Sequence, residues 1–443
     1  MASTYLRKAF STTGDRQKFS LSMWIKRGSG LGVEQMLCEC YSGSSAKDEI
    51  WLQSNDTLNF VKTDGGGLAT TTAPVYRDVG AWYHFLIAAD STQGSNADRI
   101  KIYKNGVQQT LGQQDTIPVN SNFQFGASGA ELTFGVKNDL SWYFNGSMAN
   151  VEMVDGQQLT PTYFGSFDSA SGIWTPEASS TISSYGTNGF KLKMDTTSPG
   201  ADTSGNTNTF TASGTPTLLQ GSPSNNWCTL NPLAVFFNST NPTFSNGNLT
   251  ANFPGSNQNP SLATMGITTG KWYWETKFVS LASGTAYALT GITAEAPTGS
   301  GGQNFLGGFG NSYGYGGWNG TVYNTAGSTG NTSGGATYTT GDILSMALDA
   351  DNNRLYYYKN GAIQNSGTGI VIPAAADTIF GAWFPALGEW GSTSHVWSCN
   401  FGEGFFGTTA AGTQADDNGQ GLFAYDVPAG YYALNTKNLE AYG

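Results

Sequence analysis

Two segments of the chain share one pattern of apolar and polar positions. In residues 80–109 and again in residues 341–364, an apolar run ends in aspartate, a polar turn follows, and a second run ends in Lys-Asn-Gly. The Asn-Gly pairs at 105–106 and 360–361 suit a two-residue type I′ turn, because both central residues of that turn need positive φ. The pattern therefore predicts the same hairpin twice.

Side chains alternate along each predicted hairpin. Ile100 and Ile102 fall on one face of the first hairpin, and Leu355 and Tyr357 fall on the corresponding face of the second. A single hairpin cannot bury such a face, so we expect each one to belong to its own antiparallel sandwich or barrel. Residues 19–25 also alternate cleanly, which predicts a half-buried strand.

The composition agrees with this pattern. The 443 residues include 60 glycines and 13% aromatic residues, and only 12% are charged. Such a balance is typical of many short strands joined by tight turns, so we interpret the chain as all-β. At roughly 150 to 200 residues per domain, the length predicts two to three domains.

Charge and cysteine content exclude several classes of function. A net charge of −11 disfavours binding to nucleic acid or to an anionic membrane surface, since both need clustered cations. No apolar run reaches the ~20 residues that span a bilayer, and no apolar segment follows the basic residues near the start, so we expect neither membrane insertion nor a secretory signal. We expect the four cysteines to be reduced thiols in a protein folded in a cytoplasm. Cys38 and Cys40 share a predicted strand face, but a zinc site would need further ligands nearby.

The first part of the chain resembles a known module. The segments YLRKAFSTTGDRQKFSLSMWIKRG and YFNGSMANVEMVDGQQLTPTYFG, with the hairpin between them, resemble the concanavalin A-like, laminin-G-like jelly roll found in structural proteins of tailed bacteriophages, especially marine ones. The resemblance implies an antiparallel β-sandwich over residues 1–165. Lectins, polysaccharide hydrolases and purely structural modules share this fold, so the fold alone does not decide function.

Residues 166–225 are rich in Ser, Thr, Gly and Asn, which predicts an irregular connector that either completes the first sandwich or lies against both domains. Within it, Asp202, Asn206 and Asn208 belong to a sequence, DTSGNTN, that resembles the DxSGNxN turn of laminin-G-like modules. Their side-chain oxygens are suited to a hard cation such as Ca²⁺. The alternative that we favour is an Asx-type turn bonded to its own backbone, with no cofactor.

Residues 226–408 resemble a SPRY domain through several motifs in the expected order, among them GKWYWE and the second hairpin. This resemblance implies a second concanavalin-like sandwich, which would account for the repeated hairpin. Trp272 and Trp274 share one strand face and Tyr273 takes the other, so we interpret most of these motif residues as scaffold. Residues 409–443 resemble the ending that follows SPRY modules in phage proteins, and we expect this tail to dock on a domain surface.

The sequence carries no recognisable catalytic constellation. Glycan hydrolases of the concanavalin-like fold use two carboxylates on one strand, commonly as E-x-D-x-E. Glu152 and Asp155 are the best available pair, but positions i and i+3 of a strand face opposite ways. His84 and His395 do not form a paired metal motif, and no G-x-S-x-G marks a nucleophile. We therefore expect a protein that is not an enzyme.

The best candidate binding residues are aromatic. Tyr313, Tyr315, Trp318 and Tyr323 lie among Gly and Asn in one segment, and Trp390 lies in a second glycine-containing loop. Aromatic faces can stack on sugar rings while amides bond hydroxyl groups, and Tyr- and Asn-rich loops also make good protein-binding surfaces. The alternative is that these aromatic residues alternate into the core or form a subunit contact.

Together the resemblances imply a structural protein of a phage virion, assembled in the host cytoplasm. We expect a tail-fibre or appendage adhesin that binds a host-surface glycan or protein, and whose partners are other virion subunits and its own copies, with a trimer favoured. The chain has no heptad shaft, collagen-like repeat or recognisable attachment domain. A capsid decoration or head-fibre protein is therefore an alternative. A polysaccharide depolymerase, with carboxylates such as Glu152 or Glu389 brought together only by folding, is a further one.

Overall fold

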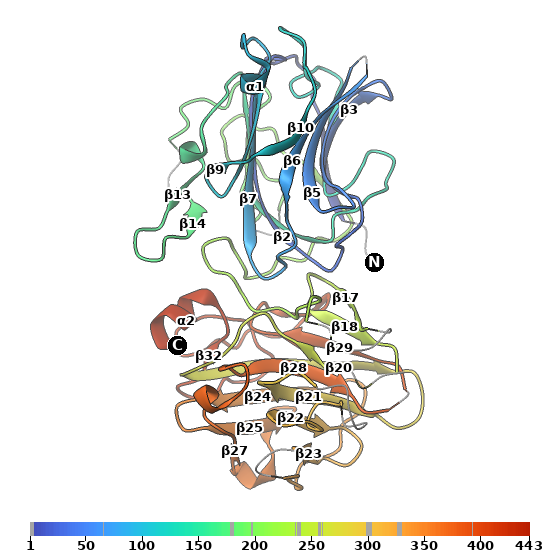
Figure 1. The fold of residues 1–443 in the computed structure, drawn as a ribbon, viewed down its shortest axis with the longest axis vertical. Helices are drawn as coiled ribbons and strands as arrows, with labels where there is room; N and C mark the ends of the chain where they lie inside the picture. Colours follow the sequence, from blue (N-terminus) through green and yellow to red (C-terminus); the bar gives the residue numbers. More distant parts are fainter. Residues whose placement is uncertain are drawn as a thin grey trace. The chain divides into compact units, whose positions relative to one another are not determined.

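The structure is a computed structural model that describes residues 4–64, 66–177, 181–195, 198–234, 236, 241–255, 258, 260–297, 304–325, 330–391 and 393–443. The chain divides into two compact units, Met1–Leu218 and Leu219–Gly443. Each unit is an antiparallel β-sandwich (Figure 1). Each sandwich has its own hydrophobic core. The prediction of an all-β chain with two sandwiches is confirmed.

The first unit packs an eight-stranded sheet against a six-stranded sheet. In spatial order, the larger sheet consists of β10 (Leu111–Gln114), β6 (Gly67–Val75), β5 (Thr57–Asp64), β4 (Ala46–Leu52), β3 (Gln35–Gly43), β11 (Glu131–Phe134), β1 (Tyr5–Ala9) and β16 (Thr211–Ser213). The smaller sheet consists of β15 (Phe190–Leu192), β12 (Gly146–Asp155), β2 (Lys18–Arg27), β7 (Trp82–Asp90), β8 (Ile100–Lys104) and β9 (Val107–Gln108). Outside both lie the helical turns α1 (Asn96–Arg99) and η1 (Pro161–Tyr163) and a hairpin of β13 (Gly165–Phe167) and β14 (Trp174–Pro176).

Strand β2 is buried on both of its faces. One face, which includes Phe19 and Leu21, belongs to the main core, as the alternation predicts. The other face carries Trp24, which is only 2% exposed and lies 4.8 Å from the ring of His84. Trp174 of the β13–β14 hairpin donates its indole N–H to His84 Nδ1 at 3.0 Å. The prediction of a half-buried strand is therefore wrong, because a hairpin that is distant in the sequence covers the outer face.

The second unit also contains two packed sheets. The larger consists of β17 (Thr243–Ser245), β18 (Thr250–Phe253), β29 (His395–Asn400), β20 (Lys271–Leu281), β24 (Ile343–Asp349), β25 (Arg354–Lys359) and β26 (Ala362–Ile363), with β27 (Ile370–Val371) paired to β25 and β32 (Tyr432–Ala433) paired to β20. The smaller consists of β19 (Ser261–Leu262), β28 (Phe384–Glu389), β21 (Ala288–Thr293), β22 (Ser312–Gly316) and β23 (Val322–Tyr323). The remaining elements are η2 (Asn365–Gly367), η3 (Ala375–Asp377), the hairpin of β30 (Phe405–Phe406) and β31 (Thr409–Ala410), and α2 (Thr436–Tyr442).

Strand β20 shows how the second unit uses both faces of its larger sheet. Trp272 and Trp274 point into the core between the sheets, and Tyr273 points to the outer face, as the alternation predicts. On that outer face, Phe423 and Ala433 of the C-terminal segment pack with Tyr273. The tail is thus a covering layer on the larger sheet, and it keeps the outer aromatic residues of that sheet from water.

Both predicted hairpins form with the expected turns. In the first, φ is 48° at Asn105 and 79° at Gly106, and in the second it is 47° at Asn360 and 78° at Gly361. The strands pair on either side of each turn, β8 with β9 and β25 with β26. The predicted inward faces lie in the two separate cores.

Residues 166–225 contain two strands that extend the sheets of the first unit. Strand β15 pairs with β12 in the smaller sheet, and β16 pairs with β1 in the larger one. The division between the compact units falls after Leu218. Most of this serine- and threonine-rich segment thus belongs to the first sandwich.

Helical structure is short wherever the chain is described. α1 has four residues and α2 has seven. No helix within the described ranges is long and apolar enough to cross a bilayer.

Candidate functional site

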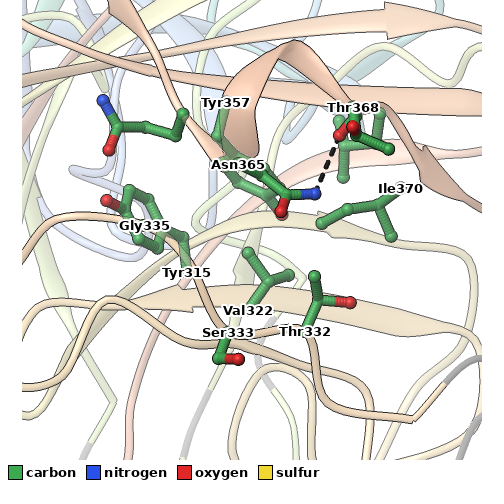
Figure 2. Close-up of a pocket in the computed structure, with 11 residues that line it drawn as sticks. Tyr315, Val322, Thr332, Ser333, Gly335, Tyr357, Asn365, Thr368 and Ile370 are labelled. Carbon is green, nitrogen blue, oxygen red and sulfur yellow. Dashed lines mark hydrogen bonds between the residues drawn. The ribbon is translucent and has the colours of Figure 1, made fainter.

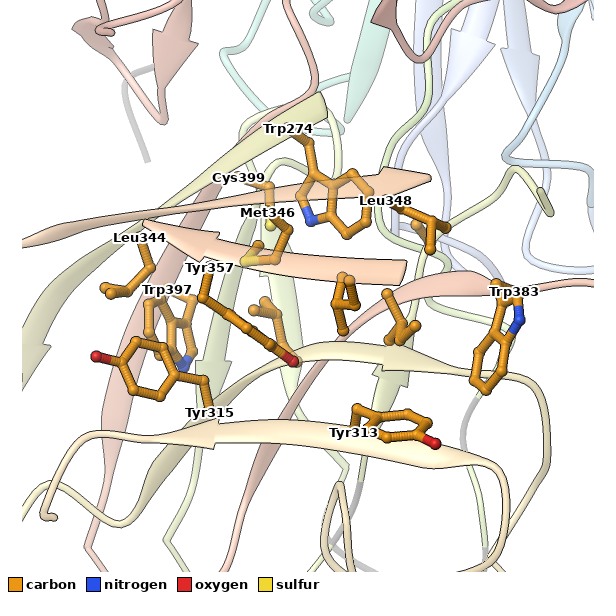
Figure 3. Packing of buried hydrophobic residues seen from close by; sticks show 14 of the residues in the cluster. Trp274, Tyr313, Tyr315, Leu344, Met346, Leu348, Tyr357, Trp383, Trp397 and Cys399 are labelled. Atoms are coloured by element: carbon orange, nitrogen blue, oxygen red, sulfur yellow. The ribbon is translucent and has the colours of Figure 1, made fainter. Parts of the chain in front are cut away.

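Two of the predicted binding residues, Tyr313 and Tyr315, lie in the core of the second unit. They alternate inward along β22 and are 1% and 0% exposed. Figure 3 shows both rings in the packed interior together with Tyr357 and Trp397. Burial raises the pKa of Tyr315 to about 12, and its hydroxyl donates to the carbonyl oxygen of Ala336. As positioned here neither ring can meet a ligand, so the prediction needs correction: period-2 alternation makes both tyrosines scaffold.

A small cavity lies beside Tyr315. Its lining includes Val322, Tyr357 and Ile370, and the Asn365 amide beside it donates to the carbonyl oxygen of Thr368 at 2.9 Å (Figure 2). The cavity measures about 10 Å³, which is the room that one water molecule needs. It is therefore a packing defect of the core, too small for a sugar or cofactor.

Two glycines of the smaller sheet, Gly316 and Gly388, occupy positions on its outer side, which is the side that faces away from the core. A Cβ at Gly316 would lie 2.9 Å from the Trp318 ring and 3.0 Å from the Tyr323 ring, and a Cβ at Gly388 would lie 2.8 Å from Leu306 Cβ. The sequence SYGYG therefore combines inward tyrosines with outward glycines. The missing side chains let aromatic residues lie flat on the outer surface of the sheet.

Five aromatic side chains occupy this outer surface, which we call the aromatic face: Tyr287, Phe305, Trp318, Tyr323 and Trp390. Trp318 and Tyr323 stack with ring centroids 5.1 Å apart, and Trp390 lies 5.2 Å from Trp318. Tyr287 lies 5.4 Å from Trp318, and Phe305 lies 5.4 Å from Trp390. Each ring is thus held by at least one neighbour, which fixes the orientation of the whole group.

The aromatic face is partly open to solvent. Trp390 is 39% exposed, whereas Phe305 is 3% exposed and serves as the base of the group. Tyr287, Trp318 and Tyr323 are half-buried. Polar groups line the edge: the Asn319 amide donates to the Tyr323 hydroxyl at 2.7 Å. The arrangement offers rigid apolar ring surface next to amide and hydroxyl groups.

The sequence indicated only three of these five residues. Trp318, Tyr323 and Trp390 are predicted to bind, and the structure brings them together from a turn, from strand β23 and from the loop after β28. Tyr287 and Phe305 were missed. A signal for Tyr287 exists, because it lies two positions before Leu289, whose side chain faces the same outer side. Phe305 has no comparable local signal.

The candidate cation ligands Asp202, Asn206 and Asn208 form the Asx-type turn that is the favoured alternative for this segment. The Asp202 carboxylate accepts bonds from the backbone N–H groups of Lys191, Ser204 and Asn208 at 2.7 to 2.9 Å, and from the Ser204 hydroxyl at 3.0 Å. The Asn206 and Asn208 amides donate to backbone carbonyl oxygens of residues 186–189. The carboxylate oxygens that a cation would need are therefore occupied by protein donors, as the favoured Asx-turn interpretation requires.

The candidate catalytic carboxylates are also bonded within the protein. Glu152 accepts a bond from the Tyr185 hydroxyl at 2.7 Å and pairs with Lys191 at 2.9 Å. Asp155 accepts the backbone N–H groups of Asp15 and Asn188, both at 2.9 Å. Within the described part of the chain, no group of three or more His, Cys, Asp or Glu side chains could hold a metal ion.

Comparisons with known proteins agree with the two sandwiches. A model of the Concanavalin A-like lectin/glucanases superfamily matches residues 2–162, and a model of the SPRY domain matches residues 271–396. The structure is similar to the SPRY domain of human HERC1, with 16% identity, a TM-score of 0.31, and coverage of 38% of this chain and 96% of that one. It is also similar to a SAP-like pentraxin of Limulus polyphemus, with 16% identity, a TM-score of 0.28, and coverage of 35% of this chain and 71% of the pentraxin.

A comparison with curated protein sequences found no match. The two domain models cover separate parts of the chain, one in each compact unit. The chain thus combines an N-terminal domain of the concanavalin A-like lectin/glucanase superfamily with a C-terminal SPRY domain.

Proposed function

We propose that the protein is a virion component of a tailed bacteriophage and attaches to a glycan or protein on the host surface through the aromatic face of its SPRY domain. The proposed binding role rests on one observation: the rings of Trp318, Tyr323 and Trp390 are ordered by their mutual contacts and partly exposed. The virion assignment rests on the resemblance of the first module and of the tail to phage structural proteins. Assembly in the host cytoplasm, with copies of the chain and other virion subunits as partners, follows from the same resemblance.

The shape of the site suits an extended ligand. The aromatic face lies on the outer surface of the smaller sheet, whereas the cavity beside Tyr315 lies on the inward side of that sheet and holds only about one water molecule. Flat ring surfaces bury the apolar faces of sugar rings or of side chains, while the amide of Asn319 at the edge can bond polar groups. Rings that are already stacked lose little conformational freedom when a ligand binds.

Binding without catalysis is part of the proposal. The carboxylates considered as catalytic groups, Glu152 and Asp155, are engaged by protein donors. Glu389 is fully buried and accepts the backbone N–H of Gly255 at 3.1 Å. A general acid must reach the bond that it cleaves, and these groups serve the fold instead.

The test uses fluorescently labelled full-length protein on host cells. Trp390→Ala and Trp318→Ala should each reduce cell binding by about tenfold or more, as expected for a Trp at the centre of a contact. Phe380→Ala is a matched control, because Phe380 is also 39% exposed but lies outside the aromatic face. Cell binding that survives both Trp substitutions would refute the role of this face. A well-folded wild type that binds no host cell would favour a capsid decoration protein, whose aromatic face meets other virion subunits.

A further inference from the structure

The hairpin of β13 and β14 lies outside both sheets of the first domain and carries exposed apolar side chains (Figure 1). Phe167 is 55% exposed and Ile173 is 59% exposed. Two further large side chains beside the hairpin are also open to solvent, Val107 at 56% and Tyr163 at 38%. We call these four residues the hairpin patch. Single exposed apolar residues are ordinary on a protein surface, but a group of them marks a contact with another molecule.

The hairpin patch is grouped around one ring, that of Trp174. The Phe167 ring centroid lies 4.9 Å from that of Trp174, and Ile173 is the chain neighbour of Trp174. A Cβ at Gly106 would lie 2.6 Å from the Trp174 ring and one at Gly165 would lie 2.7 Å from it, so both glycines pack directly on this ring. The other two patch residues are one and two positions from these glycines in the chain. The four side chains therefore form one cluster on the surface.

The hairpin that carries the patch is firmly held. Its Trp174 is buried, and the indole N–H donates to Nδ1 of the buried His84 at 3.0 Å. At the tip, the Asp168 N–H donates to the carbonyl oxygen of Ile173 at 2.8 Å, and the Asp168 carboxylate accepts the N–H and the hydroxyl of Ser171, both at 2.7 Å. The patch is thus presented on an ordered element, which loses little conformational freedom when a partner binds.

Charge distinguishes the hairpin patch from the rest of the chain. The patch residues lie in segments 105–114 and 157–176, where Asp168 is the only charged residue, and its carboxylate is bonded within the turn. The whole chain carries a net charge of −11, so two copies repel each other, and this repulsion is weakest where acidic side chains are absent. A partner selected by opposite charge would find little to pair with here, whereas a second copy offers a matching apolar patch.

Strand β13 provides a way for two copies to pair. The hairpin is a two-stranded sheet in the described part of the chain, so each of its strands has one edge without a strand partner. β14 is less exposed and ends in Pro176, which has no N–H to donate, whereas Ser166 and Phe167 of β13 are exposed. An open edge strand pairs readily with another strand. Identical strands that pair antiparallel are related by a two-fold axis, which would bring the hairpin patches of both copies together.

The size of the hairpin patch sets the expected strength of the contact. With about half of each side chain open to solvent, the four residues expose on the order of 300–400 Å². Two patches in contact would cover roughly 700 Å², whereas specific interfaces bury about 1,000 Å² or more, so residues around the patch must supply the rest. We therefore expect isolated copies to associate weakly, with a dissociation constant in the micromolar to millimolar range, and copies held on one particle to associate through multivalency.

We propose that the hairpin patch binds the hairpin patch of a second copy of this chain, with the two β13 strands side by side. Burial of Phe167 and Ile173 against the other copy drives the contact. The contact rests on the proposed function, because it names the surface through which copies of the virion component meet. It does not involve the aromatic face of the SPRY domain, so the two surfaces can be tested separately.

Sedimentation velocity of the full-length protein, at concentrations up to about 0.2 mM, tests the contact. The wild type should shift from monomer toward dimer as its concentration rises, and Phe167→Ser/Ile173→Ser should raise the dissociation constant by about tenfold or more. Val33→Ser/Val119→Ser is the matched control and should associate like the wild type, because these valines are 53% and 50% exposed but lie outside the segments that carry the patch. All three melting temperatures should agree within a few degrees, since the substituted side chains are exposed.

Cross-linking tests the pairing of the β13 strands. Ser166 is the middle residue of β13, so Ser166→Cys should place two thiols near the two-fold axis and form a disulfide between copies under mild oxidation. The four native cysteines are buried, so neither the wild type nor the control Val33→Cys should give this dimer. A wild type that stays monomeric, equal association after the Phe167 and Ile173 substitutions, or absence of the Ser166→Cys cross-link would overturn the proposal. No host cell is used, so each result leaves the cell-binding test of the aromatic face unaffected.

Discussion

Trp318 and Tyr323 stack with ring centroids 5.1 Å apart and an interplanar angle of 24°, and Gly316 leaves the space in which they lie. The two rings come from a turn and from the edge strand β23, and Trp390 reaches them from a loop that follows β28. The geometry of the proposed binding surface therefore depends on the absence of a side chain beneath it. Gly316 should therefore affect binding even though it would never contact the ligand.

Gly316→Ala should impair binding through the stacked pair. The added Cβ would lie 2.9 to 3.0 Å from the rings of Trp318 and Tyr323, so at least one ring must move. We expect host-cell binding to fall severalfold while the unfolding free energy falls by about 1 kcal/mol, because half-buried rings can shift at modest cost. Gly94→Ala is the control, since its Cβ would meet no atom within 4 Å. Unchanged cell binding by Gly316→Ala would show that the stacked arrangement does not matter.

The sequence predicts those features of this site that depend on neighbouring positions of one strand. It does not predict those that depend on pairing with a strand distant in the chain. Period-2 alternation in SYGYG is compatible with inward Tyr313 and Tyr315 and outward glycines, but the sequence alone leaves this alternative open beside that of a binding loop. Recognising β22 requires its partner β21, whose paired residues lie 19 to 27 positions earlier in the chain and whose register is fixed only by the folded sheet. Local patterns did predict both Asn-Gly hairpins and the inward Trp272 and Trp274.

In the first domain, too, strand pairing brings together residues that are distant in the sequence. Glu39 and Glu49 are opposite each other on β3 and β4, and Lys47 joins them. No local motif marks such a pair, since the hairpin register brings together positions that are ten residues apart. Trp142 comes to Trp51 from a loop still farther along the chain. Sites assembled across strands therefore stay invisible to a search for motifs along one strand.

His84 makes the stability of the first domain depend on pH. It is fully buried, and burial lowers its pKa to about 3. Its Nδ1 accepts the Trp174 indole N–H at 3.0 Å, so Nε2 carries the proton and bonds the Ser22 hydroxyl at 2.8 Å. In the unfolded chain the histidine gains a proton near pH 6.5, whereas in the folded domain it stays neutral. Unfolding is therefore favoured progressively as pH falls from about 6.5 toward 3, by up to about 1.4 kcal/mol per pH unit.

The substitution His84→Gln isolates this effect. Glutamine keeps hydrogen-bonding groups but does not titrate, so the variant should be less stable than the wild type at pH 7 and should lose less stability between pH 6.5 and pH 4.5. Urea unfolding curves of both proteins at several pH values provide the measurement. Parallel dependence on pH in the two proteins would contradict the assignment of the titration to His84.

Asp202 should stabilise the first domain through its turn and not through a cation. Asp202→Ala removes the acceptor of three backbone N–H groups and of the Ser204 hydroxyl, so we expect a loss of roughly 1–3 kcal/mol of unfolding free energy. EDTA should leave the melting temperature of the wild type unchanged, and added Ca²⁺ should not raise it. A melting temperature that falls with chelator and recovers with Ca²⁺ would restore the cation interpretation.

Glu275 should hold the C-terminal segment on the second domain. Its carboxylate is fully buried and accepts the backbone N–H groups of Ala424 and Tyr425 at 3.0 Å, together with the Asn400 amide at 3.2 Å. Glu275→Ala leaves these donors without their acceptor, which should cost roughly 3 kcal/mol or more. Because two of the donors belong to the tail, the loss should appear first there, as faster amide hydrogen exchange and protease cleavage after residue 409.

The control for this prediction is Glu440→Ala, which removes an exposed carboxylate from the same tail and should change stability by less than about 0.5 kcal/mol. Release of the tail would uncover Tyr273 and its neighbours on the outer face of the larger sheet, so the variant should also bind more of a hydrophobic dye. If exchange instead rises uniformly over the whole second domain, the tail unfolds together with the sandwich and Glu275 is a core group of one cooperative unit. Selective exchange in the tail would establish it as a separately docked layer, whose outer-face contacts can be lost while the two packed sheets remain folded.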